Sequence, residues 1–227
     1  MADLRQLLRD LPVFGGELPA FDPAATPDDP VELFTQWLLG AIRAQVPEPH
    51  AMTLATTDAD GTPSARTLIL KDVDAAGWRF AAHDGSVKGR QLAARPYAAL
   101  TFYCPPRLKG AGVPPSLARQ VRVRGPVVRE GAERSAADFL ARSAGARAEA
   151  LLGRQSQPLT SLAERDAAMA GAAEQLADDP GLVPAAWTLH TVRAESVEFW
   201  QGAKDRNHTR LAYRRAGTTW TKELLWP

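Results

Sequence analysis

The sequence is short of the residues that several large classes of protein depend on. Among 227 residues it holds a single cysteine, Cys104, which excludes an internal disulfide and a cysteine-rich metal site and fits core packing at a strand end. Lys and Arg number 27 against 26 Asp and Glu, so no excess of positive charge attracts nucleic acid. No apolar run nears the ~20 residues of a membrane span, and residues 1–16 lack the apolar region of a signal peptide. We expect a cytoplasmic protein with no membrane or nucleic-acid partner.

Several catalytic motifs are missing as well. Neither GxGxxG nor GxxxxGK[ST] occurs, which argues against a doubly wound nucleotide-binding fold. No GxSxG elbow is present. His50, His83 and His190 do not stand at metal-ligand spacings, so we expect no metal site.

The length and the 45% hydrophobic content favour one substantial core. Residues 1–28, rich in Pro, Ala and Gly, are predicted to form an extended or loosely ordered arm, and residues 29–227 a single domain. Asp29 and Pro30 mark a helix start, with Glu32 at the capping-box position. Apolar residues then recur at helical spacing as far as Ile42, which predicts one buried face.

From Ala51 onward the apolar pattern has a period of two, which is typical of strands. The predicted strands are residues 51–57, 63–72, 78–82, 98–103, 120–128, 187–192, 196–200, 210–214 and 218–224. Short turns at residues 58–61 and 74–77 join the first of them as antiparallel neighbours. We therefore predict a mainly β fold with α insertions, an antiparallel sheet that curls into a barrel.

Two interruptions separate the strands. The segment from Pro105 to Pro115 is too rich in proline and glycine for regular structure. Two helices are predicted further on, because Ser135 with Asp138 and Ser161 with Glu164 have capping-box spacing.

Three basic or capping groups could bind a phosphate. Arg66 and Lys71 bracket one strand and would face opposite sides unless that strand bends or ends between them. Ser86 can cap a short helix that carries Lys88, and a helix start attracts phosphate. Solvated charges at strand ends are the competing interpretation.

A second cationic group follows Glu198-Phe-Trp-Gln-Gly202. Arg206, His208 and Arg210 alternate, so an extended chain would place them on one face. Guanidinium groups bind carboxylate or phosphate, and a histidine can move protons near neutral pH. A polar strand face in water explains the same pattern equally well.

Six blocks in order resemble the pyridoxamine 5'-phosphate oxidase family. They are Glu48-Pro-His-Ala-Met-Thr-Leu-Ala-Thr, Arg66-Thr-Leu-Ile-Leu-Lys71, Ala118-Arg-Gln-Val-Arg-Val-Arg-Gly125, Arg154-Gln-Ser156, Glu198-Phe-Trp-Gln-Gly202 and Arg206-Asn-His-Thr-Arg210. The resemblance runs from about Asp29 to Pro227.

The resemblance implies an FMN-binding split β-barrel that forms a homodimer, with FMN between the subunits and both chains contributing to each site. The positions that would contact the flavin are Arg66, Thr67, Leu68, Lys71, Ser86, Lys88, Gln120, Gln155, Ser156, Trp187 and Arg210. Lys71, Arg142, Arg206 and His208 would hold the substrate. Arg206 and His208 are the candidate catalytic residues of a reaction that passes a hydride equivalent from a small heterocycle to flavin and then to oxygen.

The sequence also departs from the family pattern. Aligned back from Gln155 and Ser156, the Tyr, Arg and Ser that hold the substrate phosphate in the family are Asp138, Arg142 and Ala146. Aspartate repels a phosphate and alanine donates nothing to it. Other departures are Val87 in the usual Ser-Arg-Lys run, Ala81-Ala82 for Tyr-Thr, Thr188-Leu189 for Gly-Gly, and the 105–115 insertion.

These departures leave three further hypotheses open. Some of the changed blocks resemble the flavin oxidases of phenazine biosynthesis, which act on reduced tricyclic acids, and such a substrate would suit Asp138 and Ala146. A non-catalytic flavin-binding protein and a haem or deazaflavin binder on the same barrel are the others.

Overall fold

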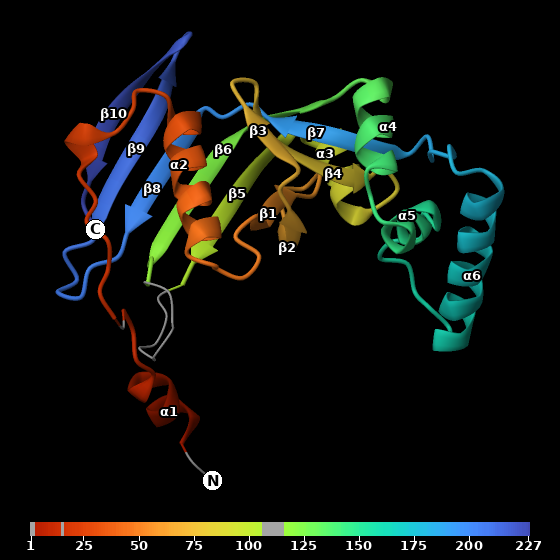
Figure 1. Cartoon of the computed structure of the whole chain (residues 1–227), viewed down its shortest axis with the longest axis horizontal. Helices are drawn as coiled ribbons and strands as arrows, with labels where there is room; N and C mark the ends of the chain where they lie inside the picture. Colours follow the sequence, from red (N-terminus) through yellow and green to blue (C-terminus); the bar gives the residue numbers. More distant parts are fainter. Residues whose placement is uncertain (1–2, 15, 106–115) are drawn as a thin grey trace. The chain divides into compact units, whose positions relative to one another are not determined.

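The computed structural model describes residues 3–14, 16–105 and 116–227 (Figure 1). The chain divides into two compact units. The first comprises residues 1–53, 100–123 and 195–227, and the second residues 54–99 and 124–194. Strands β1 (Ala51–Thr57), β5 (Tyr97–Cys104) and β6 (Arg119–Arg129) have residues in both units.

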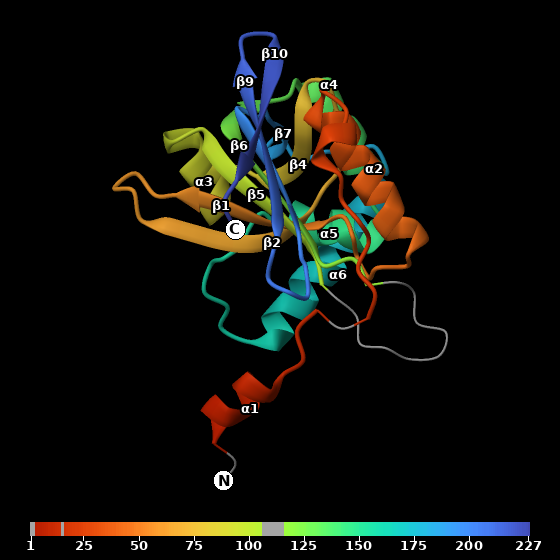
Figure 2. The same cartoon turned by 90° about the vertical axis from the view of Figure 1, so that its left-hand side faces the viewer.

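In the first unit, helix α2 (Pro30–Arg43) lies along the strands (Figures 1 and 2). The Asp29 carboxylate accepts from the Val31 N–H at 2.8 Å and Pro30 takes the first helical position, which confirms the predicted start. Two helix side chains enter the core at ring distances of 4.8 and 5.1 Å, Phe34 against Phe102 and Trp37 against Phe199. Ile42, at the end of the predicted face, is exposed.

The strands of the first unit pair in the order β10-β9-β8-β6-β5-β1. Strands β8 (Ser196–Gln201), β9 (Thr209–Ala216) and β10 (Thr219–Leu225) form antiparallel neighbours, with Trp200 opposite Arg210. Cys104 ends β5 and packs, partly buried, against Ala41, Val46 and Leu117. Its predicted packing role is confirmed, and burial raises the pKa of its thiol.

In the second unit, β2 (Pro63–Ile69) pairs with β1, while β3 (Asp72–Asp74), β4 (Gly77–His83), β7 (Trp187–Val192) and β6 pair in that order. Strand β6 thus joins early strands to late ones, as the two β blocks of the sequence predict. Gly77 has a φ of +136°, and a Cβ there would stand 2.1 Å from the Val192 carbonyl oxygen. Only glycine allows this close approach.

Three helices, not two, follow β6: α4 (Ala132–Leu140), α5 (Ala144–Leu151) and α6 (Leu162–Asp178). Ser161 caps α6 as predicted, and Ser143 caps α5, which the sequence interpretation missed. The capping box at Ser135 is wrong. Ser135 lies inside α4, and its hydroxyl accepts from the Leu189 N–H at 3.1 Å, a long-range bond that local spacing does not reveal.

The arm over residues 1–28, predicted to be extended or loosely ordered, contains two short helical segments. Helix α1 (Leu4–Asp10) begins where Asp3 accepts from the Arg5 N–H, and a short 3₁₀ turn, η1, covers Pro23–Ala25. None of the residues of α1 is buried, so its capping and its helix-forming side chains explain it without packing. The predicted loop from Pro105 to Pro115 lies outside the described residues apart from Pro105.

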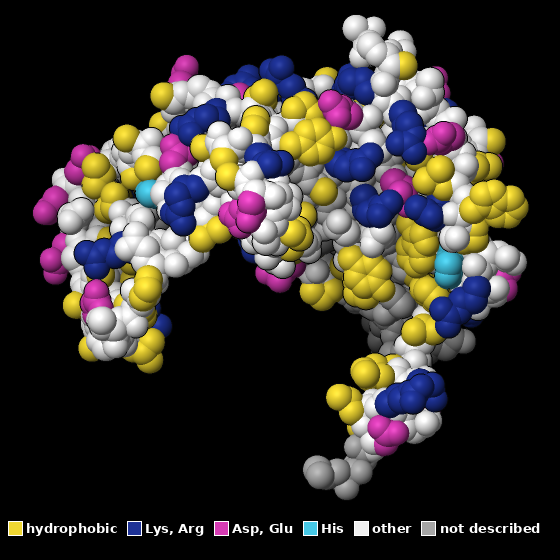
Figure 3. Space-filling view, turned by 180° about the vertical axis from the view of Figure 1, so that it is seen from behind, with side chains coloured by type: hydrophobic (Ala, Val, Ile, Leu, Met, Phe, Trp, Pro, Cys, Tyr) yellow, Lys and Arg dark blue, Asp and Glu magenta, His cyan; other side chains and the backbone are white. Residues whose placement is uncertain are grey.

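Charges of both signs are interspersed on the face seen in Figure 3, in keeping with the balanced composition. In the described part of the chain, no helix is long and apolar enough to cross a membrane. Within the same residues, His, Cys, Asp and Glu do not gather in groups of three that could hold a metal ion.

Candidate functional site

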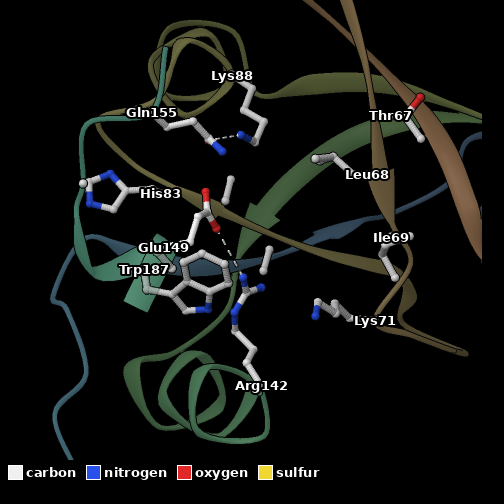
Figure 4. A pocket seen from close by; sticks show the side chains of 14 residues that line it. Thr67, Leu68, Ile69, Lys71, His83, Lys88, Arg142, Glu149, Gln155 and Trp187 are labelled. Atoms are coloured by element: carbon white, nitrogen blue, oxygen red, sulfur yellow. Dashed lines mark hydrogen bonds and ion pairs between the residues drawn. The ribbon is translucent and has the colours of Figure 1, made fainter. Parts of the chain in front are cut away.

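A cavity of about 310 Å³ opens in the second unit, within the usual size of small-ligand sites (Figure 4). Its walls come from the end of β2, from β4, from α3 (Val87–Ala94), from the helices after β6 and from β7. The lining residues are Thr67, Leu68, Ile69, Lys71, Ala81, Ala82, His83, Lys88, Arg142, Glu149, Ala150, Gly153, Gln155 and Trp187.

Lys88 is a buried cation in this cavity. Its residue is only 7% exposed, and its ammonium donates to the Gln155 side-chain oxygen, a neutral partner. Burial lowers the pKa of Lys88, the nearby Arg66 charge lowers it further, and Glu149 partly offsets both. Helix α3 starts one residue earlier, where the Ser86 hydroxyl accepts from the Gly89 N–H at 3.1 Å as predicted.

Arg66 is held in place beside Lys88 by neutral oxygens. Its guanidinium donates to Thr56 Oγ1, to Ser64 Oγ at 2.7 Å and to Gln91 Oε1 at 3.0 Å. Burial lowers its pKa, which Asp58 partly offsets. Two desolvated cations whose bonds go to neutral groups form a site that a bound anion would stabilise.

Lys71 lies beyond the end of β2, because that strand stops at Ile69. The side chain therefore reaches the cavity that Thr67 and Ile69 also line, and the alternative stated from the sequence, a strand that ends there, is confirmed. The Lys71 ammonium stands 3.8 Å from Asp138.

Trp187 and Arg142 form the wall opposite Lys88 (Figure 4). The Trp187 indole N–H donates to Asp138 at 2.9 Å, and the Arg142 guanidinium lies 4.4 Å above the indole ring. Arg142 also donates to the Ala146 carbonyl oxygen and stands 3.7 Å from Glu149. Lys71 and Arg142, the two cations at the Trp187 end of the cavity, therefore each lie near a carboxylate.

His83 is a cavity residue that the sequence interpretation did not select. Its Nδ1 accepts from the Gly85 N–H at 3.0 Å, so Nε2 carries the proton of the neutral ring. A Cβ on Gly85 or Gly153 would stand 3.2 or 3.1 Å from this ring. The only local sign was its position at a strand end, just before the Ser86 cap.

The first unit holds the other predicted residues. Arg206 has a φ of +69° in a turn, so the extended shelf of Arg206, His208 and Arg210 is wrong, and β9 begins only at Thr209. Arg206 and His208 instead both contact Phe14, at 5.4 Å and 5.2 Å, and His208 accepts from the Ala203 N–H at 3.0 Å.

Arg210 has its own carboxylate partner. It binds Glu198, which is 7% exposed, at 2.9 Å, and Glu198 also binds Arg122. These cations hold the pKa of Glu198 below its ordinary value despite the opposing effect of burial. The spacing of these residues in the sequence did not reveal that Glu198 neutralises the charge of Arg210.

The predicted residues thus separate into clear groups. Those that line the cavity are Thr67, Leu68, Lys71, Lys88, Arg142, Gln155 and Trp187. Arg66 does not line the cavity, but its charge lowers the pKa of Lys88. Ser86 caps α3, and Ser156 is exposed in a turn with a φ of +70°. Gln120, in β6, belongs with Arg206, His208 and Arg210 to the first unit.

Comparison with known proteins gives two family matches. Residues 38–177 match the family described as Pyridoxamine 5'-phosphate oxidase. Residues 187–227 match the Pyridoxine 5'-phosphate oxidase C-terminal dimerisation region.

Curated relatives match almost the whole chain. The pyridoxine/pyridoxamine 5'-phosphate oxidase of Pseudomonas fluorescens (strain SBW25) is 40% identical over 206 residues, 90% of this chain and 91% of that protein. The protein of the same name from Thermosynechococcus vestitus is 41% identical over 200 residues, 88% and 90% of the two chains.

Solved structures share the fold. PhzG from Burkholderia lata 383, in complex with tetrahydrophenazine-1-carboxylic acid, has a TM-score of 0.81 and 27% identity, with 93% of this chain and 100% of that chain covered. A pyridoxamine 5'-phosphate oxidase-related, FMN binding protein from Nostoc punctiforme has a TM-score of 0.67 and 18% identity, covering 89% and 100% of the two chains.

Proposed function

The chain belongs to the pyridoxamine 5'-phosphate oxidase family, and we propose that it is a cytoplasmic FMN-dependent oxidase of a small heterocyclic substrate. Its fold is the antiparallel split barrel of these flavin proteins. When bound, FMN supplies the chemistry of the reaction, accepting a hydride equivalent from the substrate and passing electrons to oxygen.

The observation that carries the proposal is a pair of cations, the buried Lys88 and the partly buried Arg66. Their donor set fits the phosphate of FMN, because burial lowers the pKa of both groups and their hydrogen bonds go to uncharged oxygens, with no carboxylate ion pair to either group among the described residues. The phosphate would replace the missing counter-charge next to the start of α3. Gln155, which already accepts from Lys88, would keep the ammonium aimed at it.

Other residues would shape the rest of the site. Thr67 and Leu68 present a strand edge to the cavity, and Trp187 provides an aromatic wall. Walls of this kind would hold the rings of FMN and of the substrate in a fixed relative orientation and would exclude most of the water. We place no covalent catalyst in this site.

We further propose a homodimer in which both copies contribute side chains to each FMN site. The match of residues 187–227 to a dimerisation region supports association of two chains. The proposed site also includes four residues of the first unit. Gln120 and Arg210 would contact the flavin. Arg206 and His208 would position the substrate and set its protonation.

The first substrates to test are pyridoxine and pyridoxamine 5'-phosphate, because the curated relatives are named for them. A place in pyridoxal phosphate biosynthesis would follow. A reduced tricyclic acid is the second candidate, supported by the likeness to PhzG with its tetrahydrophenazine-1-carboxylic acid.

An absorbance spectrum of the purified protein after addition of FMN tests the cofactor. We expect a flavin spectrum that persists through gel filtration, on a species of dimer mass. Anaerobic addition of each candidate substrate should then bleach the flavin, and air should restore it with release of peroxide. A colourless protein that retains no FMN would contradict the proposal.

A further inference from the structure

The two ends of the cavity differ in charge balance (Figure 4). Lys88 and Gln155 line one end, where the ammonium of Lys88 has an uncharged partner. Arg142 and Lys71 lie at the other end, with Trp187. The inference rests on the proposed function, in which the FMN phosphate binds at the Lys88 end and leaves the other end to the substrate.

Each cation at the substrate end already faces a carboxylate. Lys71 Nζ is 3.8 Å from Asp138 Oδ1, and Arg142 Nη2 is 3.7 Å from Glu149 Oε2. The formal charges of these four side chains cancel. The Asp138 side chain is only 11% exposed, so water screens its charge weakly.

The Arg142 guanidinium is occupied in a second way. Nε and Nη2 donate to the Ala146 carbonyl oxygen at 3.3 and 3.0 Å, and Cζ lies over the Trp187 ring at 4.4 Å from its centroid. Binding a phosphate through the guanidinium fork requires two parallel N–H groups. Here the backbone and Glu149 engage one side of that fork.

The Asp138 carboxylate is held by two contacts that it would lose if it moved away from this end of the cavity. Its Oδ2 accepts from the Trp187 indole N–H at 2.9 Å while Oδ1 faces Lys71. If the carboxylate turned away from an incoming anion, the indole N–H of the buried Trp187 would lose its acceptor. A phosphate dianion at this end therefore meets a fixed like charge.

From this geometry we infer that the enzyme oxidises ring substrates without a phosphate ester at least as efficiently as the corresponding phosphate esters, and that Asp138 sets this preference. A neutral or weakly charged substituent on the substrate ring suits this end of the cavity, because the formal charges of the two ion pairs there cancel. A phosphate ester on the same ring would have to displace the Asp138 carboxylate from its contacts with Lys71 and Trp187.

The test compares matched substrates on the FMN-loaded protein. Peroxide release gives kcat/KM for pyridoxine and for pyridoxine 5'-phosphate. The change in flavin absorbance gives Kd for pyridoxal and for pyridoxal 5'-phosphate. In the wild type we expect the ester to have no advantage in either measurement.

Asp138→Asn removes the charge while its amide oxygen can still accept from Trp187. We expect it to shift the ester-to-free ratio of kcat/KM or Kd toward the ester by about tenfold. Asp166→Asn, an exposed carboxylate of α6 paired with Arg165, is the control and should leave the ratio unchanged.

A wild-type preference for the ester in kcat/KM or Kd would overturn the inference, as would an Asp138→Asn ratio equal to that of the wild type. Either result would leave the flavin oxidase itself in place. Failure to retain FMN, seen before any substrate is added, would instead end the proposed function and this inference with it.

Discussion

Lys88 and Gln155 meet at one end of the cavity (Figure 4), the ammonium of one donating to the side-chain oxygen of the other. Lys88 lies in α3 and Gln155 in the connection after α5, so the bond joins segments 67 positions apart. An uncharged partner leaves the ammonium free to neutralise an anion, and this separates Lys88 from Lys71 and Arg210, which face carboxylates.

Replacing Lys88 should weaken FMN binding. Lys88→Met keeps the length of the side chain but removes the charge-assisted bond to phosphate, and we expect a loss of about 2 kcal/mol, or roughly 30-fold in Kd. Quenching of FMN fluorescence on titration measures it. Lys204→Met, at an exposed lysine, should bind FMN like the wild type. An unchanged Kd in Lys88→Met would remove Lys88 from the FMN site.

FMN affinity should also depend on pH through Lys88. Its pKa is lowered in the protein without ligand, so the free protein loses this charge at a lower pH than an ordinary lysine does. Phosphate binds the charged form, so affinity should be constant near neutral pH and fall as pH rises toward the ordinary lysine value of about 10.4. Titrations at several pH values check this, and the fall should be absent in Lys88→Met.

His190 should make the protein sensitive to acid. It is 3% exposed, neither ring nitrogen has a hydrogen-bond partner in the described residues, and burial lowers its pKa from 6.5 to about 4. The unfolded chain takes up the proton first as pH falls, so stability is lost between about 6.5 and 4.

This loss should amount to roughly 3 kcal/mol at the acid end, since each pKa unit corresponds to about 1.4 kcal/mol. Urea unfolding at pH 7 and pH 4 measures it. His190→Asn cannot titrate and should show a pH difference smaller by that amount, whereas His50→Asn, at an exposed histidine, should keep the wild-type difference. Equal pH differences in all three proteins would refute the assignment.

Glu198 should stabilise the first unit through its bonds to Arg210 and Arg122. The carboxylate is buried while both arginines keep some exposure, so we expect Glu198→Gln to lower the free energy of unfolding by about 2 kcal/mol. Denaturant melts test this. Glu223→Gln breaks the exposed pair with Arg214 and should cost no more than about 0.5 kcal/mol. Equal effects of the two changes would contradict the buried-pair account.

Replacing glycine by alanine should lower the stability of the protein at Gly77 and raise it at Gly171. Gly77→Ala places a Cβ against the Val192 carbonyl at a φ of +136°, and we expect a loss of about 3 kcal/mol or more. Gly171→Ala, in the middle of α6 with open space around the new methyl group, should gain about 0.5–1 kcal/mol. Thermal melting temperatures should move in opposite directions, and a stable Gly77→Ala protein would contradict the described packing of β4 on β7.

Much of the local structure was predictable because its causes are local. A period of two marked the strands, and Asp29, Ser86 and Ser161 marked helix starts, since a side chain caps a backbone N–H two or three residues away. The same reasoning failed at Ser135, whose hydroxyl serves Leu189, 54 positions on. Helix α5 was missed because its sequence, AGARAEAL, has no stripe of large apolar side chains to mark a buried face.

The sequence by itself determined the mainly β architecture, the family and the cations available for an anionic ligand, because periodicity, capping and motif order are properties of neighbouring residues. Only the tertiary structure decided which of these cations stay free. Asp138 reaches Lys71 and Trp187, Glu198 reaches Arg210, and His83 enters the cavity because folding brings distant segments together. Pairing between buried charges depends on distance in space, and linear spacing does not encode that distance.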